Sequence, residues 1–198
     1  MKVRRFLWLT ALAVFVSAVA LSPGPGAGRA QTGARVTPPY TLQAQAMGTQ
    51  TQVGRNFNIT ARINEYSPAS DQAILMDAFR EKGNEGLVNA LSKMPSKGRL
   101  SITGTLGGDL AYIRRFERPD GSVMIRMITN RLLRFREVWS DTRSSDYQLS
   151  GLEIIVSKDR KKKSGTLFPA AQLKVDKNGR LEIENYDFPW NLVNIMLR

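Results

Sequence analysis

Short runs of alternating apolar and polar residues, separated by turn signals, limit most strongly how this chain can fold. Alternation of this kind is typical of a β-strand with one buried face. The runs lie at residues 57–63, 99–103, 110–116, 123–129, 132–139, 152–156, 171–175, 181–183 and 190–197. The connections between most of them are short, which favours antiparallel neighbours. We therefore expect about eight or nine strands in a curled antiparallel sheet or small barrel.

One stretch, residues 67–94, departs from this pattern and predicts an inserted pair of short amphipathic helices. Its apolar residues recur at helical spacing in both halves: Ile74, Leu75, Ala78, Phe79, Leu87, Leu91 and Met94. Gly83 is expected to end the first helix, and Ser67 and Asn84 are candidate N-caps. Helices of this length are marginal alone, so both should cover the sheet. The expected fold is α+β and predominantly β.

Residues 1–30 have the pattern of an export signal. A basic head, with Lys2, Arg4 and Arg5, precedes an apolar run from Phe6 to Ala20 that is short for a bilayer span. Small and helix-breaking residues follow, and cleavage is expected after Ala20 or Ala30. The sequence therefore predicts a secreted or periplasmic protein with no transmembrane span after signal removal. A retained membrane anchor is the alternative.

The rest of the chain divides into a flexible leader or weak edge strand at residues 31–52 and a single β-rich domain at residues 53–198. Removing residues 1–30 takes four positive charges from the total of +12 and leaves +8. Such a charge favours anionic surroundings, although it also serves solubility alone. The oligomeric state does not follow from the sequence.

Histidine and cysteine are both absent from the chain. Catalysis by Ser–His–Asp or Cys–His groups is therefore impossible, and so are the usual zinc and haem sites. The glycine-rich stretch at residues 104–109 lacks the lysine and hydroxyl of a phosphate loop and is expected to be a turn. We predict a non-enzymatic protein without a cofactor or a metal site.

The leading hypothesis is binding of an anionic cell-envelope component or protein through arginines. A guanidinium holds phosphate or carboxylate with two donors. The candidate anion-binding residues are Arg114, Arg115, Arg131, Arg134, Arg136 and Arg143. A separate basic run, residues 158–163, is interpreted as a solvated turn. No module for specific nucleic-acid binding is present.

Two alternatives remain at this point. The first is a lipocalin-like barrel that carries a small apolar ligand, lined by Leu110, Phe116, Met124 and Met127. The second is a carboxylate-based hydrolase that uses Asp141 and Asp146, which share a polar loop. Acidic residues are common in such loops for conformational reasons alone, so this second alternative needs support from elsewhere.

Several motifs resemble those of an uncharacterised family of exported bacterial proteins. They lie at residues 77–79, 86–94, 104–107, 129–135, 143–147 and 181–186, and together the resemblance covers most of residues 55–197. The family usually has an acid followed by arginine and proline near the middle, where this chain has Asn130, Arg131 and Leu132. The resemblance implies export and a shared fold, and it implies no known activity.

Overall fold

The computed structural model describes residues 36–130, 148–176, 180–185 and 189–198. The chain divides into two units, Met1–Ala30 and Gln31–Arg198, and every element below belongs to the second. The predicted signal and the expected strand at residues 132–139 lie outside the described residues.

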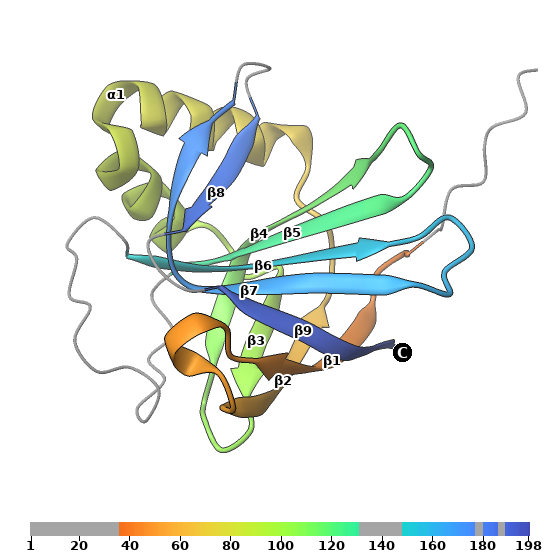
Figure 1. Cartoon of the computed structure of the whole chain (residues 1–198). Coiled ribbons are helices and arrows are strands. Elements are labelled where there is room, and N and C mark those ends of the chain that lie inside the picture. Colours follow the sequence, from red (N-terminus) through yellow and green to blue (C-terminus); the bar gives the residue numbers. More distant parts are fainter. Residues whose placement is uncertain (1–35, 131–147, 177–179, 186–188) are drawn as a thin grey trace, which may run out of the picture. The chain divides into compact units, whose positions relative to one another are not determined.

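Eight strands close into an antiparallel barrel, and a ninth extends it (Figure 1). The strands are β1 (Tyr40–Met47), β2 (Asn56–Ile63), β3 (Gly98–Ile102), β4 (Gly108–Glu117), β5 (Val123–Thr129), β6 (Leu149–Val156), β7 (Lys163–Val175), β8 (Leu181–Asn185) and β9 (Trp190–Leu197). Around the barrel the order is β6-β5-β4-β3-β2-β1-β9-β7, and β7 pairs again with β6. Strand β8 adds to β7 alone, through residues 171–175. The expected small barrel of eight or nine strands is confirmed.

The barrel interior is filled by the inward side chains of its strands. On β1 the buried residues Leu42, Ala44 and Ala46 alternate with half-buried polar ones. Val123, Ile125 and Met127 are the corresponding inward residues of β5, and both sets belong to one apolar cluster. Barrels of eight strands are just wide enough for side chains to fill them.

The helix α1 (Ala69–Lys93) covers the outer face of part of the barrel. Its buried residues Leu75, Leu87 and Leu91 belong to a second apolar cluster, together with one residue from each of five strands, Tyr112, Ile128, Leu149, Leu173 and Leu181. Each leucine buried in this way contributes about 1.5–3 kcal/mol. The helix is thus held by packing on the barrel, as its short arms require.

A break divides α1 into the two expected arms. Lys82 and Gly83 have non-helical backbone angles, and Gly83 has a positive φ of 56°. Gly86 then brings the second arm back against the first, since a Cβ there would lie 2.1 Å from the Ala78 carbonyl oxygen. The predicted stop at Gly83 is therefore confirmed, and Gly86 adds a close approach that the sequence pattern did not indicate.

The two predicted N-caps bond elsewhere. Pro68 occupies the N-cap position of α1. The Ser67 hydroxyl instead accepts a hydrogen bond from the Ile113 amide of β4, 3.1 Å away. The side chain of Asn84 bonds β7, donating to Gln172 and accepting from the Leu173 amide. Both residues therefore attach α1 to the barrel.

The interpretation of residues 31–52 as a flexible leader is wrong for β1. This strand pairs along its length with β2 and also with β9, so it lies inside the closed barrel. Its inward alanines are small, and its outward residues are glutamines and threonine, which is why the strand lacks the usual bulk. A short 3-10 helix, η1 (Gln50–Gln52), forms part of the connection to β2.

Candidate anion-binding end of the barrel

Two hairpin turns lie side by side at one end of the barrel. Residues 118–122 join β4 to β5, and residues 157–162 join β6 to β7. The last row of the four strands runs from Glu117 through Val123 and Val156 to Lys163. Beyond this row, a Cβ on Gly121 would lie 3.1 Å from the Lys158 side chain, so the turns are in contact.

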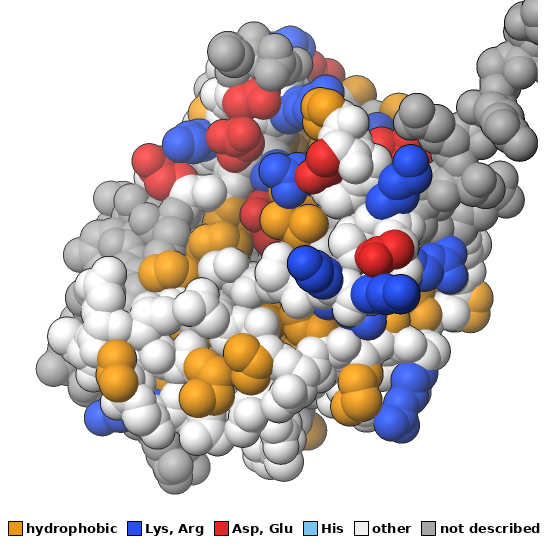
Figure 2. All heavy atoms as spheres, turned by 45° about the vertical axis from the view of Figure 1, so that its right-hand side comes forward, with side chains coloured by type: hydrophobic (Ala, Val, Ile, Leu, Met, Phe, Trp, Pro, Cys, Tyr) orange, Lys and Arg blue, Asp and Glu red, His pale blue; other side chains and the backbone are white. Residues whose placement is uncertain are grey.

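Positive charge is concentrated on these two turns. Six basic residues and two acidic ones, Asp120 and Asp159, lie within residues 118–122 and 157–163. The basic residues, called the basic end below, are Arg118, Lys158, Arg160, Lys161, Lys162 and Lys163. All except the half-buried Lys163 are exposed. Figure 2 turns this side of the barrel forward and shows Lys and Arg side chains gathered in the middle and right of the face, with single acidic ones between them.

The two acids hold the turns in shape. The Asp120 carboxylate accepts hydrogen bonds from the Ser122 hydroxyl and amide, at 2.6 and 2.9 Å. The Asp159 carboxylate accepts from the Ser157 hydroxyl and the Lys161 amide. These bonds lower the pKa of both carboxyl groups, chiefly through the serine hydroxyls. The acids therefore support the presentation of the lysines while remaining charged.

A tyrosine pair lies near this end of the barrel. Tyr40, the first residue of β1, has its hydroxyl 3.2 Å from that of Tyr66, which donates to the Val36 carbonyl at 2.7 Å. Arg115 is close enough to lower the pKa of both tyrosines, but burial outweighs it, and both pKa values are raised. Burial also raises the pKa of Tyr112, which lies on the outer face of the barrel under α1.

These tyrosines predict cooperative unfolding at alkaline pH. A raised phenol pKa means that the folded protein holds its proton more tightly than the unfolded chain does. The resulting stability is complete below the unfolded pKa of about 10 and is lost as pH rises toward the folded values. We expect tyrosinate absorbance to rise in one step, together with loss of the β circular dichroism signal. Gradual ionisation of all tyrosines in an intact fold would contradict this expectation.

The two predicted arginines that the structure describes, Arg114 and Arg115, have different neighbours. Arg114 lies opposite Arg126 on the outer face of β4 and β5, and its guanidinium donates to the Ser67 carbonyl at 3.2 Å. Arg115, the next residue of β4, belongs to the other face of the strand. Its guanidinium lies 3.0 Å from the Glu117 carboxylate. Arg131, Arg134, Arg136 and Arg143 lie outside the described residues. Five of the six residues of the basic end lie in the run 158–163, which the sequence predicts to be a solvated turn.

The predicted apolar lining is also divided. Leu110 and Met127 are fully buried in the barrel interior. Phe116 and Met124 oppose each other on the outer face, where the Phe116 ring lies 5.3 Å from the Arg126 guanidinium carbon. The four residues therefore line no common cavity. Asp141 and Asp146 lie outside the described residues, and the described part of the chain holds no group of three side chains suited to a metal ion.

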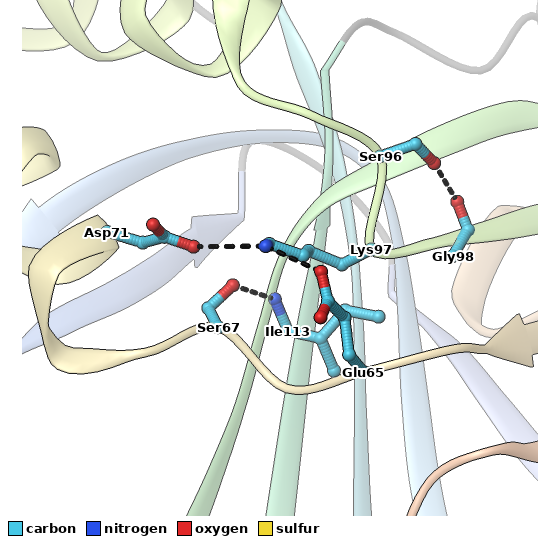
Figure 3. A network of polar contacts seen from close by, with 7 residues as sticks. All are labelled: Glu65, Ser67, Asp71, Ser96, Lys97, Gly98 and Ile113. Atoms are coloured by element: carbon cyan, nitrogen blue, oxygen red, sulfur yellow. Dashed lines mark hydrogen bonds and ion pairs between the residues drawn. The ribbon is translucent and has the colours of Figure 1, made fainter.

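A buried lysine joins α1 to the barrel (Figure 3). Lys97 has a side chain 10% exposed, and its ammonium group lies 2.7 Å from the Glu65 carboxylate and 3.8 Å from that of Asp71. The hydrogen bond to Glu65 is the main cause of the raised pKa of Lys97. Lys97 links residues on either side of the junction between α1 and the barrel, so we assign this cluster a structural role.

A groove of about 680 Å³ lies between the two arms of α1. Its walls include the apolar residues Ile74, Ala78, Ala90 and Met94, together with Asp71, Glu81, Lys82 and Lys93. The charged residues of its lining carry both signs in equal number. The groove therefore favours no single ligand chemistry.

No protein-family model, curated protein or solved structure matches this chain. The resemblance to exported bacterial proteins accordingly stays a prediction. Among the described residues, no helix is both long enough and apolar enough to cross a membrane.

Proposed function

We propose that the protein is exported and binds an anionic partner of the cell envelope through the basic end, without catalysing a reaction. The observation that carries this proposal is the contact between two hairpin turns that together present six basic side chains and two acidic ones. Four of the six are lysines, which act as hydrated point charges. The expected partner is therefore a surface or polymer of high charge density, bound without a shape-specific pocket.

The strength of this binding follows from simple electrostatics. A lysine or arginine near an anionic surface contributes about 1 kcal/mol, and the attraction falls off within the Debye length of about 8 Å at physiological salt. The hydrogen-bonded turns add rigidity, so that little conformational freedom is lost on binding. Affinity should therefore be moderate at low salt and fall steeply as salt rises.

A lipocalin-like carrier would share the closed barrel, but the interior gives that alternative less support. Leu42, Ile125 and Leu152 each have no exposed surface and pack in one apolar cluster. An apolar ligand would have to displace such side chains from a filled interior.

Charge reversal at the basic end tests the proposal. The variant Lys158→Glu/Lys161→Glu/Lys162→Glu should bind heparin and phosphatidylglycerol vesicles about a hundredfold or more weakly than the processed wild type at low salt, since each position loses at least about 1 kcal/mol. The measurement is a binding titration at several salt concentrations.

A matched control makes the same charge change elsewhere. Arg80→Glu/Lys82→Glu/Lys93→Glu alters three exposed residues of α1. This control should reduce affinity by less than about fivefold, because its charges lie away from the proposed contact. Equal losses in the two triple variants would show that net charge alone governs binding. A wild-type protein that ignores heparin, vesicles and cell-wall polymers would end the proposal.

A further inference from the structure

The part of the chain that the structure describes begins at the end of the barrel where the basic end lies. Val36, the first described residue, is 9% exposed and belongs to the interior cluster, and its carbonyl accepts the hydrogen bond of Tyr66. Tyr40 then starts β1, and Arg115, two residues before the last row of β4, acts electrostatically on both tyrosines. In Figure 1, β1 starts on the side where the two hairpin turns and the C-terminus lie. Whatever precedes Val36 therefore joins the barrel at this end.

The sequence before Val36 contains a segment suited to a membrane. The apolar run Phe6–Ala20 follows a basic head, and residues 21–35 separate it from the barrel. Even fully extended, these fifteen residues span at most about 50 Å. The predicted export signal, residues 1–30, is expected to lie in the membrane at least until it is cut. Val36 would then lie within reach of the bilayer.

The opposite end of the barrel has a different chemistry. There the β1–β2 connection and the turn between β3 and β4 carry Val53, 74% exposed, and Leu106, 87% exposed. In the described residues of these two connections, 48–55 and 103–107, Arg55 is the one charged side chain. An anionic surface would therefore attract the two hairpin turns of the basic end more strongly than these two connections.

We infer that the partner of the basic end is the anionic surface of the membrane into which the predicted export signal is directed. The barrel lies on the bilayer with residues 118–122 and 157–163 against the lipid phosphates, and with Val53 and Leu106 pointing away. This inference rests on the proposed function and adds to it the identity of the anionic partner and the orientation of the barrel. Contact is electrostatic, because none of the large exposed apolar side chains of the described residues lies on the two turns.

The absence of cysteine makes the orientation directly measurable. Ser164→Cys, at the start of β7, and Thr51→Cys, in η1, place single thiols at exposed positions near the two ends and preserve every charge. Each variant is prepared in the processed form, without the export signal, labelled with a fluorescent donor and added to vesicles of phosphatidylcholine and phosphatidylglycerol that contain an acceptor on the lipid head group. Energy transfer should be several-fold stronger from position 164 than from position 51.

Two further measurements distinguish a failure of the membrane assignment from a failure of the proposed anion binding. In processed protein carrying Lys158→Glu/Lys161→Glu/Lys162→Glu, or with the processed wild-type sequence and vesicles of phosphatidylcholine alone, the difference between the two positions should disappear. Equal transfer from both positions in the wild-type sequence, or stronger transfer from position 51, would overturn the inference. If the processed protein still binds heparin in a salt-dependent manner in that case, the proposed anion binding stands and only the membrane assignment fails.

Discussion

Replacing Arg126 with alanine is expected to destabilise the barrel by about 3–5 kcal/mol, the usual loss when one member of a buried ion pair is removed. The Arg126 side chain is 8% exposed and lies 2.5 Å from the Glu153 carboxylate on the neighbouring strand β6. Its guanidinium also donates to the Leu181 carbonyl of β8 and lies over the Phe116 ring. The variant would leave a carboxylate and a carbonyl without their donor in a largely buried place. Chemical denaturation monitored by circular dichroism measures the loss.

A second variant separates the loss of the ion pair from the loss of packing. Arg126→Met/Glu153→Leu removes both charges and restores apolar volume, so it should recover most of the stability. Arg126→Lys should recover little, because one ammonium group cannot replace a guanidinium group that donates to both Glu153 and the Leu181 carbonyl. A loss below about 1 kcal/mol in Arg126→Ala, the size typical of exposed pairs, would show that this contact is solvated.

Arg126 also illustrates why the candidate site could not be located from sequence alone. It belongs to a stretch rich in basic residues, and its linear neighbours suggested a shared anion-binding surface. Strand parity instead places it on the outer face of β5, where it pairs with Glu153 of β6 and donates to the Leu181 carbonyl of β8. For the basic end, the sequence predicts only a solvated turn at residues 158–163, and residues 118–122 belong to a different hairpin. Their contact depends on the strand order, which no local pattern encodes.

The fold was more predictable than the site because it depends on local periodicity. Alternation predicted β2, β5 and the paired parts of β7 and β8, in which Leu173 faces Ile183. Glycine chemistry predicted the break in α1. For strand β1 the sequence indicates only a flexible leader or a weak edge strand, because Ala44 and Ala46 bury little surface and their low bulk masks the period of two. Small inward residues suit a narrow barrel, but that requirement becomes visible only once the barrel is closed.

The second large effect is expected at Lys97. Lys97→Met should lower the free energy of unfolding by about 2–4 kcal/mol, because Asp71 would lose its nearby cation in a buried place. The Asp71 side chain is 16% exposed, and one of its carboxylate oxygens has no hydrogen bond and lies 3.8 Å from the Lys97 ammonium group. The Glu65 carboxylate is 59% exposed, so water can replace its contact with Lys97 at little cost.

A double-mutant cycle tests whether the unpaired Asp71 charge causes this loss. Asp71→Asn alone should change stability by less than about 1 kcal/mol, and Lys97→Met/Asp71→Asn should be more stable than Lys97→Met because no buried charge remains.

The pH dependence gives an independent check. The raised pKa of Lys97 means that its contribution is complete below the unfolded value of about 10.4 and is lost as pH rises through the folded value. Lys97→Met should therefore lose less stability than the wild type in this alkaline range. Additive losses in the cycle, with an unchanged alkaline profile, would show that Lys97 stabilises the barrel through packing of its aliphatic chain.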